Sequence, residues 1–181
     1  MRSHAASLHL VPPPAPDAVS VRPVTLDDLE RIDELRAGVS EAGHPLRFFS
    51  DARVAHADAY RRSPDSGIDH YGLLAQAPDG TVLAHAAYMR LWGPRAELSL
   101  EIADGAERLE LAARLVGELA WVAQRNGIRR FVAAGPTSNA DIVELFGHAG
   151  GLGRGGWAVL AFPTAACLSL GGRRPALAPV L

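Results

Sequence analysis

The sequence predicts an α/β protein with a mixed sheet, in which an antiparallel meander is joined to a parallel βαβ unit. Two apolar runs, 70–77 and 81–91, flank the turn sequence Pro-Asp-Gly, which is a strong hairpin signal. An alternating run follows at 95–103. The apolar spacing then becomes helical over 107–125 and returns to a strand at 128–134. Because the connections on both sides of this helix are short, the two strands that it joins are expected to be parallel.

Shorter elements are expected on both sides of this unit. Residues 19–24 alternate apolar and polar side chains and suit a short strand. Thr25 lies three residues before Asp28, an acidic form of the capping box, and helical apolar spacing follows. Three more elements are predicted: a helical region at 45–60, a shorter helix at 139–149 and a last strand at 157–162. The predicted order is therefore β-α-α-β-β-β-α-β-α-β.

The composition fits one domain between two tails. The chain has 181 residues, of which 48% are hydrophobic and 21% are charged, and this is enough apolar surface for one sizeable core. Proline or glycine accumulates in residues 1–18 and 171–181, which are expected to be flexible tails. The domain is accordingly expected to span residues 19–170.

Charge and cysteine content argue against several functional classes. The formal net charge is −2 and the pI is about 6.4, whereas nucleic-acid-binding domains usually carry a basic stripe. No apolar run reaches the roughly 18 residues of a membrane span. The single cysteine, Cys167, cannot form an intramolecular disulfide or a multi-cysteine metal site, and is expected to be a small buried hydrophobe. We therefore expect a cytoplasmic protein without nucleic-acid, membrane or metal partners.

Element order and short sequences together resemble one known superfamily. Four pieces match in order: RFFS at 47–50, RAEL at 95–98, GIRRFVA at 127–133 and FGHAG at 146–150. They resemble segments of the GNAT (GCN5-related N-acetyltransferase) superfamily, and in particular of its bacterial protein-lysine acetyltransferases. The similarity covers roughly residues 19–165 and implies the GNAT fold.

The resemblance implies an acyltransferase that moves the acetyl group of acetyl-CoA, its co-substrate, to an amine of a small molecule or to a protein lysine. Such a reaction needs a base to deprotonate the ammonium, and Glu97 matches the family's catalytic glutamate. A carboxyl suits this role when burial raises its pKa; the alternative is a solvent-facing glutamate on an alternating strand. The resemblance further implies Ile102, Arg108 and Asn139 as cofactor-binding residues, although Asn139 is also a good N-cap. It is also compatible with a homodimer.

The segment that should bind the pyrophosphate of acetyl-CoA departs from the family pattern. GNAT enzymes have Q/R-x-x-G-x-G/A before the long helix, so that backbone amides and the helix dipole hold the phosphates. In an ungapped alignment Arg108 and Glu110 occupy the first two glycine positions. Ala112 occupies the last position, where the family pattern allows alanine. The guanidinium of Arg108 could bind phosphate, whereas a carboxylate in the first turn would repel it. Besides an N-acetyltransferase, the sequence therefore leaves open an impaired GNAT-like regulatory or protein-interaction module, or an unrelated α/β binding domain.

Two further patterns have structural interpretations. The spacing Gly-x-Gly-x-x-Gly at 151–156 precedes an expected strand, whereas the dinucleotide fingerprint opens a helix, so we interpret it as a flexible lead into a hairpin. His70 and His85 lie on the two strands of the expected hairpin and could face each other. Because no histidine pair has metal-ligand spacing on an expected helix, packing or surface exposure is the favoured role for both.

Overall fold

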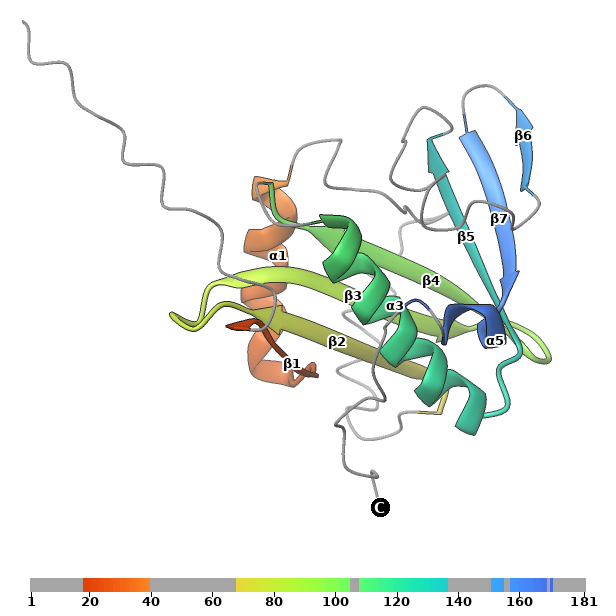
Figure 1. Cartoon of the computed structure of the whole chain (residues 1–181), viewed down its shortest axis with the longest axis horizontal. Coiled ribbons are helices and arrows are strands. Elements are labelled where there is room, and N and C mark those ends of the chain that lie inside the picture. Colours follow the sequence, from red (N-terminus) through yellow and green to blue (C-terminus); the bar gives the residue numbers. More distant parts are fainter. Residues whose placement is uncertain are drawn as a thin grey trace, which may run out of the picture.

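A mixed sheet organises the structure (Figure 1). The computed structural model describes residues 18–39, 68–104, 108–136, 151–154, 157–168 and 170. Within them the strands form one seven-stranded sheet in the order β1-β2-β3-β4-β5-β7-β6. The strands are β1 (Ser20–Pro23), β2 (His70–Gln76), β3 (Val82–Arg90), β4 (Arg95–Ile102), β5 (Arg130–Pro136), β6 (Gly151–Arg154) and β7 (Trp157–Pro163). The helices are α1 (Leu29–Gly38), α3 (Arg108–Arg125) and the short α5 (Thr164–Cys167), with a 3-10 turn, η2, at Leu26–Asp28. The expected helical regions at 45–60 and 139–149, and nearly all of the two tails, lie outside the described residues.

The meander of β2, β3 and β4 confirms the predicted hairpin and third strand. β3 is antiparallel to both of its neighbours. In the first turn the Gly80 N–H donates to the Ala77 carbonyl at 2.9 Å, and Gly80 has a φ of +87°, which glycine adopts without a steric penalty. The carboxylate of Asp79 accepts from the Thr81 N–H at 2.9 Å and completes the turn. The sequence Pro-Asp-Gly therefore forms the turn that its residue types indicate.

The C-terminal part of the sheet contains one strand more than predicted. The expected strand at 157–162 is confirmed as β7, which pairs antiparallel with β5. The segment interpreted as a lead into it is itself a strand, β6, paired with β7 from Gly151 opposite Leu160 to Arg154 opposite Trp157. Its four residues include two glycines and show no alternation, so the sequence carried no strand signal. Because a strand and not a helix follows Gly151–Arg154, this segment is not a dinucleotide fingerprint.

Helix α3 is the predicted crossover between two parallel strands, β4 and β5. The helix ends at Arg125, and Gly127, two residues further on, has a φ of +77°. The Gly127 N–H donates to the Gln124 carbonyl at 3.1 Å, and the Ile128 N–H donates to the Ala123 carbonyl at 2.9 Å. These two bonds form a Schellman motif, which satisfies carbonyl groups that the helix end would otherwise leave unpaired. The sequence signal Asn-Gly thus stops the helix and turns the chain into β5.

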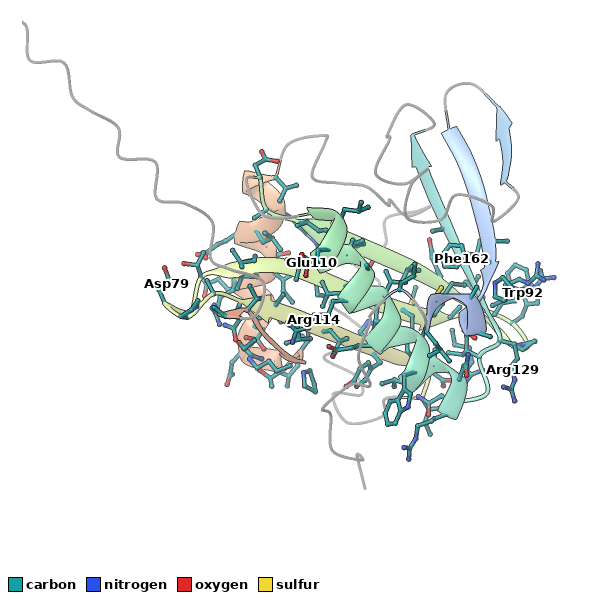
Figure 2. All side chains as sticks on the ribbon, in the orientation of Figure 1. Asp79, Trp92, Glu110, Arg114, Arg129 and Phe162 are labelled. Carbon is teal, nitrogen blue, oxygen red and sulfur yellow. The ribbon has the colours of Figure 1, made fainter. Side chains whose placement is uncertain are left out.

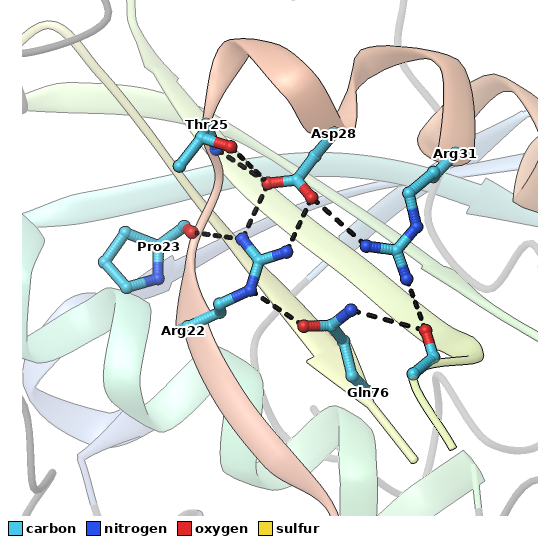
Figure 3. A network of polar contacts seen from close by, with 7 residues as sticks. Arg22, Pro23, Thr25, Asp28, Arg31 and Gln76 are labelled. Atoms are coloured by element: carbon cyan, nitrogen blue, oxygen red, sulfur yellow. Dashed lines mark hydrogen bonds and ion pairs between the residues drawn. The ribbon is translucent and has the colours of Figure 1, made fainter. Parts of the chain in front are cut away.

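The start of α1 is fixed by the predicted capping box and by an ion pair (Figure 3). The Asp28 carboxylate accepts from the backbone N–H of Thr25 at 2.9 Å and from its hydroxyl at 2.8 Å. The guanidinium of Arg22 donates to both oxygens of Asp28 at 2.6 Å. These hydrogen bonds from Arg22 hold the pKa of Asp28 well below its usual value, against the opposing effect of burial. Arg31 contacts Asp28 as well and donates to the Gly80 carbonyl, so that one cluster joins β1, α1 and the hairpin turn.

The sheet is covered by α3 on one face and by α1 on the other (Figure 1). The α3 face holds the main core, where the helix buries its apolar stripe against alternate residues of the central strands. On β4 these are Ala96, Leu98, Leu100 and Ile102. On the α1 face Ile32 packs on Leu74 and Val24 in a smaller cluster. The remaining β4 residues point to the α1 face, because successive side chains of a strand alternate.

Candidate active site

The parallel pair β4 and β5 stays together for only three residues. Arg95 lies opposite Arg130, Ala96 opposite Phe131 and Glu97 opposite Val132. Beyond this point β4 continues to Ile102 and β5 to Pro136 without further pairing between them. Figure 1 shows β5 running away from β4 together with β7. The two central strands therefore diverge, and the backbone edges that face the divergence are not joined by ladder hydrogen bonds.

Glu97 is the last β4 residue that pairs with β5, so it lies where the divergence begins. Its exposed fraction is only 6%, which rules out a solvent-facing glutamate on this strand. On the same face of the sheet its neighbours are Met89 of β3 and Val132 of β5. The structure thus places a buried carboxylate at the start of the divergence, directly between Met89 and Val132 on the neighbouring strands.

Polar residues continue along the α1 face of β4. Ser99 is fully buried, and Glu101 has an exposed fraction of 6%. The Ser99 hydroxyl lies 3.5 Å from the Ala87 carbonyl of β3. This polar row is the opposite of the α3 face, where alternate β4 residues are all apolar. A buried polar row is costly unless its members are hydrogen-bonded, so it indicates either a structural network or a site.

Glu101 is the centre of a buried ion network at the α1 end of this row. The Arg36 Nε donates to the two Glu101 oxygens at 2.7 and 2.8 Å. The His85 Nδ1 lies 3.2 Å from Glu101 Oε2. Burial alone would raise the pKa of Glu101, but the hydrogen bonds and charges of His85 and Arg36 outweigh it and lower this pKa. The carboxylate therefore stays ionised and holds α1 against β4 and β3.

The two hairpin histidines share a sheet face but do not lie opposite each other. His70 pairs with Met89, whereas His85 pairs with Leu74, so the prediction that they could face each other is wrong in register. Both are buried, which confirms packing rather than surface exposure. Burial, followed by the charge of His85, lowers the pKa of His70 to about 4. Among the described residues no group of three potential ligands could hold a metal ion.

The three residues expected to bind the cofactor differ in where they lie and in whether the structure describes them. Ile102 is the last residue of β4, and its side chain is fully buried in the main core, so a ligand at this position would meet its backbone. Arg108 is the first residue of α3, and Glu110 is an exposed residue in the first turn of that helix (Figure 2). Asn139 lies outside the described residues. The structure thus brings Glu97 and Ile102 onto one strand beside the divergence, with Arg108 and Glu110 at the start of the helix that follows.

The Arg36–Glu101–His85 network was not found from the sequence. The alternation Glu97, Ser99, Glu101 on β4 was a detectable signal for a polar face. What the sequence did not reveal is that Arg36, which is 65 residues away along the chain, reaches this face from α1.

Comparisons with known proteins agree with this architecture. No protein-family model matches the chain, and no curated protein matches it significantly. Among solved structures, the GNAT domain of S. lividans PAT is similar at 28% identity and a TM-score of 0.62, over 80% of this chain and 90% of that one. A GCN5-related N-acetyltransferase from Kribbella flavida is similar at 21% identity and a TM-score of 0.61, over 82% and 99% of the two chains. The acetyltransferase yncA from Salmonella typhimurium, described as putative and solved with acetyl-CoA, is similar at 17% identity and a TM-score of 0.61, over 81% and 94%.

The structure and these likenesses define a mixed α/β fold whose central parallel pair diverges beside a buried carboxylate. This is the fold of the acetyltransferases named above. The chain therefore has the GNAT fold. No helix within the described ranges has the length and apolar character needed to cross a membrane.

Proposed function

We propose that the protein is an N-acetyltransferase that uses acetyl-CoA, with Glu97 as its general base. The observation that carries this proposal is the position of Glu97: a buried carboxylate on the last pair of β4 and β5 before the strands diverge. The solved structures of similar fold support acetyl-CoA as the co-substrate, since one of them contains it. The acceptor would be an amine of a small molecule or of a protein.

The chain's own groups have defined parts in this reaction. The cofactor would supply an acetyl thioester, whose carbonyl carbon the amine attacks. Glu97 would take a proton from the acceptor ammonium, since only the free amine is a nucleophile. A carbon–nitrogen bond forms and the carbon–sulfur bond breaks, and the leaving thiolate takes up a proton to give the thiol. Beyond Glu97, no described strand pairs with the β5-facing edge of β4, so its backbone groups could hold an extended ligand.

One observation favours a second candidate, an impaired GNAT-like module that binds acetyl-CoA weakly. Glu110 lies in the first turn of α3 and is exposed, in a place where the helix dipole would otherwise attract a phosphate. A carboxylate there stabilises the helix by about 0.3–1 kcal/mol and repels an incoming anion. Replacing Glu110 with glutamine should therefore tighten acetyl-CoA binding by roughly two- to fivefold, which isothermal titration calorimetry would measure.

Binding and turnover together test the first proposal. A ligand at 100 times its Kd adds about 2.7 kcal/mol to the free energy of unfolding, so acetyl-CoA should raise the melting temperature. Glu97→Gln should lower kcat by about a hundredfold or more while acetyl-CoA binding is retained. The matched control is Glu118→Gln, the same chemical change at a half-buried glutamate of α3 that pairs with Arg114. If Glu97→Gln and Glu118→Gln affect turnover equally, Glu97 is not the base.

A further inference from the structure

Two arginines lie side by side next to Glu97. Arg95 of β4 is directly opposite Arg130 of β5, two pairs before Glu97 and Val132, with Ala96 and Phe131 between them. Residues two apart on a strand share a face, so Arg95, Arg130 and Glu97 all lie on the α1 face of the sheet. Both arginines are exposed, whereas Glu97 is buried. The sheet therefore presents two exposed arginines where β4 and β5 are still paired, next to the position that we assign to the base.

Neither of these guanidinium groups is neutralised within the described part of the chain. Arg22, Arg36 and Arg90 each have a carboxylate partner. The contact found for Arg95 is different, since its Cζ lies 5.9 Å from the centre of the Trp92 ring, and Arg130 has no ion pair with a described residue. Trp92 itself is 69% exposed. Figure 2 shows it at the end of the sheet opposite the Asp79 turn.

Like charges directly opposite each other on neighbouring strands are destabilising. The backbones of adjacent strands are about 4.8 Å apart, so repulsion disfavours a close approach of the Arg95 and Arg130 guanidinium groups unless an anion lies between them. A carboxylate removes the cost, because the planar guanidinium fork matches it and donates two hydrogen bonds. The stacking of Arg95 on Trp92 also restricts the orientation of the Arg95 guanidinium before a carboxylate binds.

We infer that the acceptor of this protein carries a carboxylate several atoms away from its reactive amine, and that Arg95 and Arg130 bind that carboxylate while Glu97 deprotonates the ammonium. This inference rests on the proposed function. The two positions are two residues apart along β4, which corresponds to about 7 Å. The amine and the carboxylate of the acceptor are therefore separated by several carbon atoms or by a residue step. An ω-amino acid and a lysine followed by an acidic residue both have this chemistry.

The test compares acceptors that differ only in this charge. One arm uses lysine peptides with glutamate or glutamine beside the lysine, and the other uses an ω-amino acid and its carboxamide. In at least one arm, kcat/KM should be about tenfold higher for the acid, which is the size expected for charge-assisted hydrogen bonds. Arg95→Gln and Arg130→Gln should each reduce this preference, and added salt should weaken it as well. The arm that shows the preference identifies the source of the carboxylate.

The control is Arg125→Gln, which removes the same charge from an exposed arginine of α3 that stacks on Trp121 instead. It should leave the preference for the acid intact. Equal rates for the acid and its amide in both arms, or an equal effect of Arg125→Gln, would overturn the inference while leaving the acetyltransferase proposal standing.

Absence of turnover with every amine would count against the proposed function and not against the arginine pair. In that case the same four compounds are titrated against the protein by calorimetry. Tighter binding of an acid than of its amide, lost in Arg130→Gln and retained in Arg125→Gln, supports the carboxylate site. Binding that does not distinguish acid from amide, or no binding of any of the four compounds, rejects it.

Discussion

Replacing Glu101 with glutamine should lower the free energy of unfolding by about 3–5 kcal/mol. The two partners in this ion pair are nearly inaccessible: the side chains of Arg36 and Glu101 are 6% and 8% exposed. Glutamine keeps the size of the side chain but removes the charge that faces the guanidinium. Arg36 would then be a buried cation whose other described carboxylate, Asp33, lies 3.3 Å away and is 71% exposed. Since whole domains are stable by only about 5–15 kcal/mol, this loss is large.

Urea denaturation of the purified protein measures the effect, and Asp33→Asn is the matched control. That variant removes a carboxylate from the same guanidinium at an exposed position, where an ion pair contributes about 0–1 kcal/mol. The double variant Arg36→Met, Glu101→Leu should recover most of the stability, because a hydrophobic pair can replace a buried ion pair. A loss of under 1 kcal/mol in Glu101→Gln, or equal losses in Glu101→Gln and Asp33→Asn, would refute the reasoning.

Three further predictions concern single groups. The pKa of His70 is lowered from 6.5 to about 4, so between these pH values the unfolded chain binds a proton at His70 and the folded chain does not. The free energy of unfolding should therefore fall by up to about 3 kcal/mol as the pH drops from 6.5 to 4. In denaturation curves measured across this range, His70→Gln should reduce the dependence of stability on pH. Asp28→Ala removes the capping box and the Arg22 pair and should cost about 2–3 kcal/mol by urea denaturation, whereas the exposed neighbour Asp27 should tolerate alanine within about 0.5 kcal/mol. Burial raises the pKa of Cys167 to about 12, so a thiol reagent at pH 8 should label it only after unfolding, and fast labelling of the native protein would contradict its burial.

Local signals predicted the parts of the fold that local chemistry determines. The Asp79 turn and the Asp28 cap form hydrogen bonds over two or three residues, so the residue types that make them are adjacent in the sequence. The helix stop at Gly127 is equally local. Strand β6 was missed because it forms by pairing with β7, and nothing in its own four residues favours a strand.

The candidate site could be predicted only in part, for a related reason. Alternation on β4 showed that Glu97 and Glu101 share a face, but it did not show what covers that face. Their burial follows from packing with elements distant in the sequence, as the contact of Arg36 with Glu101 illustrates. The proximity of Arg95 and Arg130 likewise exists only through the register of the parallel pair. Glu97 itself was identified by resemblance, and its role as base stays a prediction.

The divergence of β4 and β5 does not depend on Arg108 and Glu110 at the start of α3. β5 pairs with β7 over its whole length, from Arg130 opposite Pro163 to Pro136 opposite Trp157, but with β4 over only three residues. Its path is therefore set by β7, while the backbone N–H groups of Arg129 and Arg130 hold its start to the Pro94 carbonyl at 2.8 and 3.1 Å. Arg108 and Glu110 lie at the far end of β4, after the strand has already separated from β5. Substitutions at Arg108 or Glu110 should therefore change the affinity for an anion and leave the strand divergence beside Glu97 in place.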